Sequence, residues 1–421
     1  MEDTGIRMQV LFLIHRYPPA VGGSERFTQE MARRLASQGH QVTIYTSNAL
    51  AAESLWQKGW TTLPCGVEED GGVRVERFRA RVLPIHGAVG RLAAMIPWNP
   101  IGLTLAPPGL VIPDLWRAAR AAHGFDLVHA SAFPSMMYLG SVAARRSGAR
   151  LVLMPCSHPG SENDKAQQRY FFSHRMANLY SRADAVIALT DQERQWLTRV
   201  GVAPQRVHVV GAGTDTEPAT TADGGRFRAR FGLSENDAIV TFIGHKTSGK
   251  GALDMLEASR LLLPQRANLV FALIGNPTAR FLQSFRALPD QIRKRVLNLR
   301  LTEQDKHDLL AASSMLALPS RNDSFGIVLL EAWLHGKPVI GSRAGGIQEV
   351  IEEGQTGLLM PHGDVPALVN AISWLLDHPA EASRMGSEGH ERVLENWTWD
   401  SVYERVGRAY AFAMDQPHNV S

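Results

Sequence analysis

Met8–Ile14 has the sequence MQVLFLI, and this short stretch predicts the fold class. A nearly continuous apolar run of this length is typical of a strand that is buried on both faces, as in a parallel sheet covered by helices. Pro18-Pro19 then interrupts regular structure, and Ser24 is the expected N-cap of a helix that runs to about Ser37. A buried strand, a loop and a helix in this order indicate the first unit of an α/β domain.

The same alternation of strand and helix continues along the chain. Further apolar runs of strand length are Gln41–Thr46, Leu127–Ala130, Leu151–Met154, Ala185–Leu189, Val207–Val210, Ile239–Ile243, Leu269–Ile274, Met315–Leu318, Pro338–Gly341 and Gly357–Met360. Helices are expected at Met136–Arg146, Ala166–Arg182, Ala252–Leu263, Ile327–Leu334 and Val365–Leu376. The polar stretch 217–225 (EPATTADGG) separates two such series and predicts a linker or domain edge. The sequence therefore predicts an α/β protein with two Rossmann-like, doubly wound domains that face each other across a cleft.

The composition argues against several other classes of protein. Hydrophobic residues make up 44% of the 421 residues, and 44 basic against 41 acidic residues give a net charge of +3, too small to indicate nucleic acid as the main partner. The two cysteines, Cys65 and Cys156, are too few for a disulfide framework and fit a reducing compartment. The acidic start Met1–Asp3 is unlike a signal peptide, and prolines interrupt the longest apolar stretch, Leu92–Trp116, so no spanning helix is expected. We therefore predict a cytoplasmic protein.

The segment Pro319–Val350, PSRNDSFGIVLLEAWLHGKPVIGSRAGGIQEV, resembles the C-terminal signature of GT-B glycosyltransferases of family 4. The matching positions are Asp323, Phe325-Gly326, Glu331, Gly336, Pro338-Val339, Gly345-Gly346 and Glu349. Other parts that resemble this family are Tyr17–Gly23, Val128-His129, Ser157-His158, Val207–Asp215, and Gly244 with Lys250-Gly251. The resemblance covers nearly the full chain. It implies an acceptor-side domain over 1–215, a nucleotide-sugar donor domain over 216–396, and a last helix over 397–421 that crosses back to the first domain.

The resemblance implies a retaining glycosyltransferase that moves a sugar from a nucleoside-diphosphate sugar to an acceptor hydroxyl, with UDP as the expected nucleotide. The leaving diphosphate gains negative charge, which either a metal ion or cationic side chains with helix N–H groups must stabilise. No Asp-x-Asp pair occurs in the chain, so we expect a metal-independent reaction without a cofactor. Because no carboxylate of the N-terminal half is evidently placed as a nucleophile, we expect a front-face transfer in which the departing phosphate takes the acceptor proton.

Lys250 is the expected cation at the diphosphate, because it matches the family's lysine and precedes a predicted helix. Gly244 begins the same loop. His245 stands where the family usually has an arginine, and a neutral imidazole binds phosphate less well than a guanidinium does. Lys246 is therefore the expected substitute. The plain alternative for Lys250 is a solvated surface position.

The other donor contacts are expected just after residue 322. A helix is expected to begin there and to present free N–H groups to the phosphates, at Ser324, Phe325, Gly326 and Ile327. Glu331 is expected to accept hydrogen bonds from two ribose hydroxyls, one at each carboxylate oxygen. Asp323 replaces the family's usual glutamate and is expected to hold hydroxyls of the donor sugar.

Several residues of the N-terminal half are expected near the reaction. Gly22 and Gly23 would let the backbone approach the donor or the acceptor. His158 follows a buried strand and is expected, with Lys250 and Asp323, to make up the catalytic group. For His129, which ends another strand, packing is an equal alternative. Likewise, Glu303 lines a base pocket or simply belongs to a capped helix start.

Alternative functions remain open at this point. An epimerase of the same fold or a non-catalytic nucleotide-sugar-binding relative would share the motifs, although the epimerase needs further acid and base groups that we do not identify. A nicotinamide-dependent dehydrogenase is disfavoured, because His15–Ser24 lacks Gly-x-Gly-x-x-Gly. No motif tells whether the acceptor is a glycan, a lipid-linked acceptor or a small molecule. The stretch Val82–Trp116 is either an acceptor wall or a loop that touches the inner face of the membrane.

Overall fold

The computed structural model describes residues 7–51, 61–82, 110–132, 134–157, 171, 173–321 and 323–417. The chain divides into two compact units. Unit 1 contains residues 1–157, 165–210 and 403–421, and unit 2 contains residues 158–164 and 211–402. The boundary between residues 210 and 211 lies a few residues before the one expected at 215.

Unit 1 is built around a mostly parallel sheet with the strand order β10-β9-β8-β7-β1-β2-β4-β3. Its strands are β1 (Gln9–Leu13), β2 (Gln41–Ser47), β3 (Gly66–Asp70), β4 (Val73–Phe78), β7 (Leu127–Ser131), β8 (Arg150–Met154), β9 (Ala185–Ala188) and β10 (Val207–Val209), with the separate pair β5 (Arg81–Val82) and β6 (Leu110–Val111). Its helices are α1 (Gly23–Ser37), α4 (Pro113–Ala121), α5 (Pro134–Ser147), α7 (His174–Tyr180) and α8 (Asp191–Arg199). The strands β1, β7, β8 and β9 are almost wholly buried, which confirms the parallel-sheet interpretation of their apolar runs.

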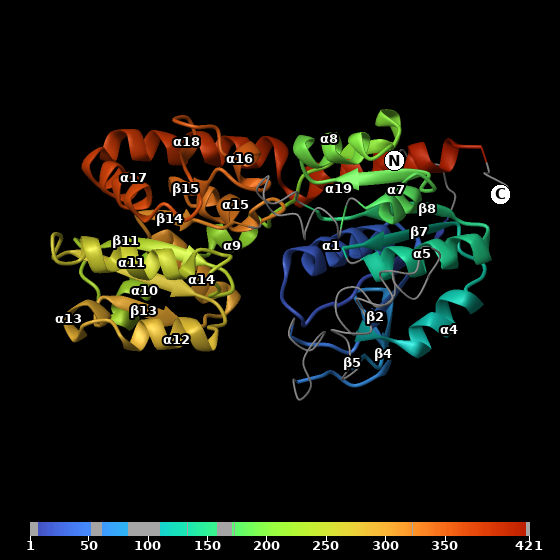
Figure 1. The fold of residues 1–421 in the computed structure, drawn as a ribbon, viewed down its shortest axis with the longest axis horizontal. Helices are drawn as coiled ribbons and strands as arrows, with labels where there is room; N and C mark the ends of the chain where they lie inside the picture. Colours follow the sequence, from blue (N-terminus) through green and yellow to red (C-terminus); the bar gives the residue numbers. More distant parts are fainter. Residues whose placement is uncertain are drawn as a thin grey trace. The chain divides into compact units, whose positions relative to one another are not determined.

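Unit 2 is built around a fully parallel sheet with the order β13-β12-β11-β14-β15-β16 (Figure 1). The strands are β11 (Ala238–Ile243), β12 (Leu269–Ile274), β13 (Val296–Leu299), β14 (Met315–Leu318), β15 (Val339–Ser342) and β16 (Gly357–Met360). The helices are α9 (Glu217–Thr220), α10 (Gly224–Phe231), α11 (Ala252–Leu262), α12 (Ala279–Arg286), α13 (Asp290–Arg293), α14 (Glu303–Ala312), α15 (Ile327–Leu334), α16 (Ile347–Val350), α17 (Val365–Asp377) and α18 (Pro379–Asn396). Numbered within the unit, the order is 3-2-1-4-5-6, that of dinucleotide-binding folds.

The two sheets confirm the predicted fold class of doubly wound α/β domains. In each unit the order of strands reverses at one place, between β1 and β7 in unit 1 and between β11 and β14 in unit 2. At such a switch point the loops that follow the two central strands diverge to opposite faces of the sheet and leave space for a ligand. The loops after β1, β7, β11 and β14 are therefore the first places to look for a site.

The last helix, α19 (Trp399–Asp415), begins in unit 2, and its residues from Tyr403 onward belong to unit 1. There the hydroxyl of Tyr410 lies 2.6 Å from Nδ1 of His129. Both side chains are almost completely buried. This contact favours the packing alternative for His129.

Two local expectations differ from the structure. Helix α1 begins at Gly23 with Gly22 as its N-cap, and the hydroxyl of Ser24 donates to Glu25 instead of capping the helix. The polar stretch 217–225, predicted as a linker or a domain edge, lies just after the start of the main part of unit 2 at residue 211 and contains α9 and the start of α10. Asp223 caps α10 by accepting from the backbone N–H groups of Gly225 and Arg226, which explains why a polar sequence is helical here.

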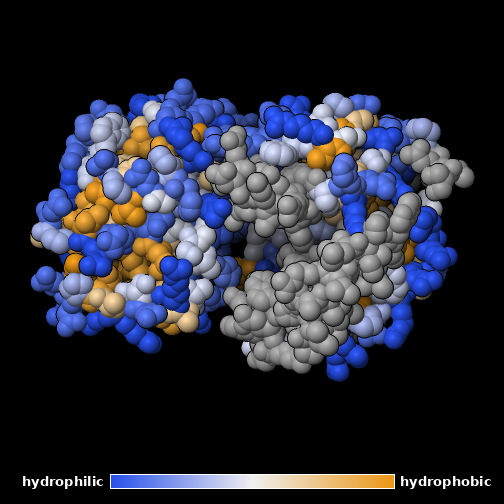
Figure 2. All heavy atoms as spheres, viewed as in Figure 1, coloured by the Kyte–Doolittle hydropathy of each residue, from blue (hydrophilic) through white to orange (hydrophobic). Residues whose placement is uncertain are grey.

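The surface of the described residues carries large apolar side chains only at scattered places. Figure 2 shows apolar areas of unit 2 interspersed with polar ones. The strongly exposed large apolar residues are Val21, Val67, Leu261, Leu394 and Met414. Among the described residues, no helix combines the length and the apolar character needed to cross a membrane. Most of the stretch Val82–Trp116, on which the acceptor-wall and membrane alternatives depend, lies outside the described residues.

Candidate functional site

The loops that follow β11 and β14 meet at the switch point of unit 2. The backbone N–H of Arg321 donates to the carbonyl of Gly249 at 2.8 Å. A Cβ at Gly251 would lie 2.3 Å from the carbonyl oxygen of Pro319, and Gly251 has a φ of 78°. Only glycine allows both this close approach and this backbone conformation, so the Lys250-Gly251 pair fixes how the two loops touch.

This meeting of loops brings Lys250 to Asp323. The ammonium Nζ of Lys250 donates to Oδ2 of Asp323 at 2.7 Å. The two side chains are 32% and 20% exposed, so the pair is accessible but partly shielded. The expected diphosphate cation and the expected sugar-binding carboxylate thus form one charged pair at the switch point of unit 2.

The loop that carries Asp323 is held in place by a glycine pair. The N–H of Gly346 donates to the carbonyl of Asp323 at 2.8 Å. A Cβ at Gly345 would lie 2.4 Å from that same carbonyl oxygen, and a Cβ at Gly346 would lie 2.1 Å from the carbonyl oxygen of Ser324. The Gly345-Gly346 pair therefore has a packing role, which is to let this loop lie directly against α16.

Helix α15 begins beside this pair without a cap of its own. Gly326 is its N-cap with a φ of 88°, no side chain that the structure describes caps the helix, and no acidic residue lies in its first turn. The ring of Phe325 is buried and packs edge-on against Trp397, with ring centroids 5.7 Å apart. The positive end of the helix is thus fixed in direction and has no carboxylate of its own.

Glu331 lies one turn further along α15 and is mostly buried. Its Oε1 accepts a hydrogen bond from Nζ of Lys306 in α14 at 2.8 Å. Its Oε2 is buried and has no hydrogen-bond partner among the described residues. A buried carboxylate oxygen without a donor is costly, so this atom indicates where a ligand hydroxyl would bind.

Lys246 and Lys250 share one loop but differ in environment. Lys246 is completely buried, and its Nζ donates to Oδ1 of Asn298 at 2.6 Å and to the carbonyl of Leu299 at 3.0 Å. Burial lowers the pKa of Lys246 to about 7, and the charge of Arg300 adds to this effect. This placement corrects the expectation of a second diphosphate cation, because the side chain is turned into β13 and already has two acceptors. His245 is half-buried in the same loop.

Glu303 is the first residue of a capped helix, which was one of the two alternatives expected for it. Thr302 is the N-cap of α14 and accepts from the N–H of Asp305 at 3.2 Å. Oε1 of Glu303 accepts from Lys306 at 2.5 Å. The nearby His307, helped by the charge of Lys306, lowers the pKa of Glu303 to about 2.

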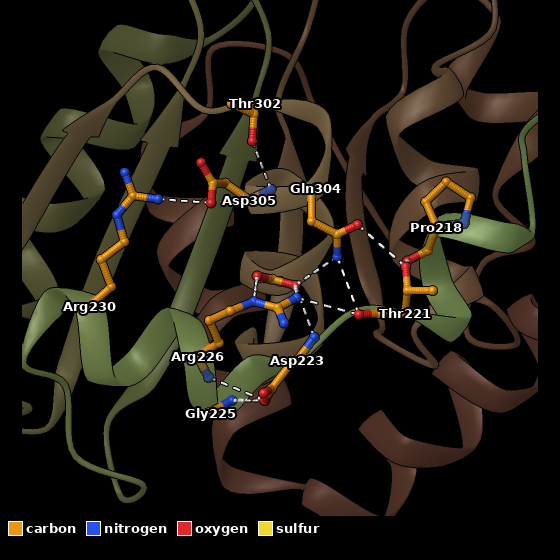
Figure 3. Close-up of polar contacts among 10 residues, drawn as sticks. Pro218, Thr221, Asp223, Gly225, Arg226, Arg230, Thr302, Gln304 and Asp305 are labelled. Atoms are coloured by element: carbon orange, nitrogen blue, oxygen red, sulfur yellow. Dashed lines mark hydrogen bonds and ion pairs between the residues drawn. The ribbon is translucent and has the colours of Figure 1, made fainter.

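A polar cluster fixes α14 against α10. The carboxylate of Asp308 accepts from Nε and Nη2 of Arg226 at 2.5 and 2.6 Å and from the side chain of Gln304 at 3.1 Å. Figure 3 shows Arg226 and Gln304 both directed at the backbone carbonyl of Thr221, with a separate pair between Arg230 and Asp305. These contacts join α14 to α10 and so help to position Lys306, which lies in α14.

At the switch point of unit 1, the predicted glycines lie beside buried charges of the chain itself. Glu25 is 1% exposed, and its Oε1 lies 2.5 Å from Nη2 of Arg16 and 3.3 Å from Nε2 of His15. A Cβ at Gly22 would lie 2.2 Å from Oε2 of Glu25. Gly22 thus makes room for the Glu25 carboxylate at the start of α1, and Gly23 is the first residue of that helix.

His158 lies outside the described residues, but the residues that lead to it are described. Glu193 accepts from both the N–H and the hydroxyl of Ser157, at 2.6 and 2.8 Å, and from the N–H of Leu189 at 2.8 Å. Cys156 has a φ of 51°, a strained value for a residue with a side chain. Sequence reasoning missed Glu193, although the pair Thr190 and Glu193 has the spacing of a capping box.

Among the described residues, no group of three or more His, Cys, Asp or Glu side chains is arranged to hold a metal ion. The switch point of unit 2 brings together Lys250, Asp323 and the start of α15. This set can stabilise an anion next to a polar, uncharged group such as a sugar.

Comparisons with known proteins agree with this fold. Residues 22–213 match the family model of the glycosyl transferase 4-like domain, and residues 225–392 match that of the glycosyl transferases group 1. A D-inositol 3-phosphate glycosyltransferase of Catenulispora acidiphila is 28% identical over 94% of this chain and 91% of its own length. One from Streptomyces avermitilis is 29% identical over 93% of this chain and 83% of its own length.

Solved structures show the same architecture. Anabaena Alr3699/HepE, solved in complex with UDP and glucose, has a TM-score of 0.72 at 21% identity, covering 96% of this chain and 100% of its own. Sucrose-phosphate synthase of Thermosynechococcus elongatus has a TM-score of 0.74 at 20% identity, covering 96% and 98%. The chain therefore belongs to the glycosyltransferases with the GT-B fold, and it contains both the 4-like domain and the group 1 domain of that family.

Proposed function

We propose that this glycosyltransferase is a retaining, metal-independent enzyme that transfers a sugar from a UDP-sugar to an acceptor hydroxyl. The observation that carries the proposal is the arrangement at the switch point of unit 2. There Lys250 meets Asp323 at 2.7 Å, beside the uncapped start of α15. This arrangement supplies a cation, helix N–H groups and a hydrogen-bonding carboxylate within one small region.

Each of these groups has a partner in a nucleotide sugar. The diphosphate binds the ammonium of Lys250 and the N–H groups that follow Gly326, which stabilises the charge that grows on it as it leaves. Asp323 accepts hydrogen bonds from hydroxyls of the donor sugar. Oε2 of Glu331, which has no hydrogen-bond partner within the described part of the chain, accepts from a ribose hydroxyl.

The relatives support the choice of substrates. The structure of Alr3699/HepE was solved with UDP and with UDP-glucose, which makes UDP the first nucleotide to test. The curated relatives are named for D-inositol 3-phosphate, a small phosphorylated polyol, and this is the first acceptor to test. Glycans and lipid-linked acceptors remain in the test panel.

In the proposed step, the acceptor oxygen attacks the anomeric carbon on the face that the diphosphate is leaving. The bond from the anomeric carbon to the diphosphate oxygen breaks, the bond to the acceptor oxygen forms, and the acceptor proton passes to the departing phosphate. Lys250 and the start of α15 stabilise the diphosphate throughout, while His158 is proposed to contact the reacting sugar or the acceptor. Catalysis then comes from positioning and charge stabilisation.

The test is a transfer assay with a panel of nucleotide sugars and acceptors in the presence of EDTA, with product analysis by NMR. We expect UDP release that depends on an acceptor, with the anomeric configuration of the donor retained in the product. The Lys250→Ala variant is expected to lose most of this activity, and Lys294→Ala, which removes an exposed lysine at the end of α13, is the matched control.

Three results would contradict the proposal. Activity that EDTA abolishes and Mg²⁺ or Mn²⁺ restores contradicts metal independence. A product of inverted configuration contradicts the retaining step. Conversion of a UDP-sugar to its epimer without an acceptor points instead to an epimerase.

A further inference from the structure

Lys306 is a buried cation that the proposed reaction does not itself use. Its side chain is 13% exposed and lies in α14, the helix that packs beside α15. Its ammonium bonds Oε1 of Glu331 at 2.8 Å and Oε1 of Glu303 at 2.5 Å. Lys306 thus joins a carboxylate of the proposed donor site, in α15, to a carboxylate of its own helix, α14.

The charge of Lys306 is secured by these neighbours. Burial by itself would lower the pKa of Lys306, but the carboxylates of Glu331 and Glu303 outweigh it and raise that pKa. Lys306 therefore stays an ammonium with hydrogen bonds directed at both carboxylates. Removing it would leave two acceptor groups facing each other without a donor between them.

The polar contacts continue along α14 and α15 and limit the movement of the side chains that take part in them. Nδ1 of His307 lies 3.0 Å from Nε2 of His335, and Nε2 of His307 lies 3.6 Å from Oε1 of Glu303. Glu331 and His335 are one turn apart near the end of α15, as Glu303 and His307 are at the start of α14. Together with the pairing of Arg226 and Asp308, these contacts fix the position from which Lys306 reaches Glu331.

The two oxygens of Glu331 have different surroundings as a result. Oε1 is held by Lys306, whereas Oε2 is buried and without a partner among the described residues. A carboxylate that is free to rotate could exchange its oxygens, but a hydrogen bond from a buried ammonium at Oε1 fixes the plane of the group. The donor site then presents one defined acceptor atom.

We propose that Lys306 is a positioning residue of the donor site, which holds Oε1 of Glu331 so that Oε2 accepts the hydrogen bond from a ribose hydroxyl. This inference rests on the proposed function, because it needs a ribonucleotide at Glu331. It assigns the ribose contact to one oxygen of Glu331, where the sequence predicted both. It also makes α14 part of the donor site, through the contact of Lys306 with Glu331.

The test is calorimetric binding of UDP and of 2′,3′-dideoxy-UDP, which lacks the ribose hydroxyls, to wild type and variants. Lys306→Met should weaken UDP binding about tenfold, the size of one lost charged hydrogen bond, and should change dideoxy-UDP binding by less than about twofold. In a Glu331→Gln background the same substitution should change UDP binding by less than about twofold, because the two residues act as a unit. Lys306→Arg should restore most of the affinity.

The control is Lys294→Met, an exposed lysine of the same unit, which should bind both ligands as wild type does. If Lys306→Met does not fold, as judged by thermal melting, Lys306→Ala, which also lacks a hydrogen-bond donor, takes its place in the same cycle. Equal weakening of UDP and dideoxy-UDP, or additive effects with Glu331→Gln, would overturn the inference and leave the proposed function standing. No binding of UDP by wild type would overturn the proposed donor, and the inference with it.

Discussion

The two switch points of this glycosyltransferase have the same strand arrangement but hold different charged groups. In unit 1 the start of α1 holds the carboxylate of Glu25, which Arg16 and His15 contact from the loop after β1. In unit 2 the start of α15 has no side-chain cap and no acidic residue in its first turn, and the charged pair beside it is partly exposed. A helix start that already holds a carboxylate is a poor place for a diphosphate, whereas an uncapped one beside a lysine is a good place.

The comparison assigns stability to one set of charges and binding to the other. Glu25 is 1% exposed, so its pairs with Arg16 and His15 serve the fold of unit 1. The side chain of Lys250 is 32% exposed and can exchange its contact with Asp323 for one with a ligand. Substitutions at the two switch points should therefore change different measured quantities.

The largest effect is expected from Glu25→Ala. This change leaves Arg16 as a buried charge without its carboxylate, and breaking such a pair typically costs about 3–5 kcal/mol. Urea unfolding followed by circular dichroism should show this loss in the transition of unit 1, whereas UDP affinity in water should stay within about twofold of wild type. A loss of UDP binding in a variant that is still folded would mean that the unit 1 switch point takes part in donor binding.

The next effect is expected from Lys250→Ala. Loss of a charge-assisted hydrogen bond of about 1.5–3 kcal/mol corresponds to weaker UDP binding by roughly 10- to 150-fold. Calorimetry should show this loss with a melting temperature close to that of wild type.

Lys246→Met is the variant to compare with it. Because the buried Lys246 bonds Asn298 and Leu299, this substitution should lower the melting temperature and leave the affinity for UDP nearly unchanged. The reverse pattern would contradict the assignment of the two lysines.

Asp323→Ala should separate the sugar contact from the diphosphate contact. UDP should bind at least as tightly as to wild type, because Lys250 loses a competing carboxylate. The rate of sugar transfer should fall about 10- to 100-fold, since hydroxyl contacts that position the donor sugar are lost. Parallel calorimetry and transfer assays test this, and an equal loss of UDP affinity and transfer rate would show that Asp323 does not act on the sugar.

The smallest effect is expected from pH. Burial lowers the pKa of His129 in unit 1 to about 3, and burial with the nearby His307 lowers that of His335 in unit 2 to about 4. Both histidines are neutral in the fold, while the unfolded chain takes up protons below about 6.5. Stability is therefore full above that pH and falls as the pH decreases toward 4 and 3, by about 1–2 kcal/mol between pH 7 and 5 for His129.

Thermal melting from pH 7 to pH 5 measures this loss, and the variant His129→Asn should show a shallower decline. A decline as steep as that of wild type would mean that His129 is not a source of the acid sensitivity.

Much of the fold was predictable because it depends on local apolar runs. The buried strands β1, β7, β8, β11 and β12 were identified from their sequences alone. By contrast, β3 and β4 were missed, because β3 is polar and exposed at the sheet edge. The Gly71-Gly72 turn between them, where both residues have a positive φ, was the available signal for a hairpin.

The candidate site was predictable only where a motif fixed it. Lys250 and Asp323 were each chosen from sequence, and the structure brings them together. The difference in burial between Lys246 and Lys250 could not be predicted, because burial of Lys246 depends on β13, some fifty residues away in the chain. The same holds for Lys306, whose contact with Glu331 requires α14 to pack beside α15.

The most direct test of the central claim is a crystal structure of the protein grown with UDP in the presence of EDTA. We predict the diphosphate against Nζ of Lys250 and the N–H groups that follow Gly326, with a ribose hydroxyl donating to Oε2 of Glu331. UDP bound at the loop after β1, or bound elsewhere while Lys250 keeps its contact with Asp323, would contradict the account.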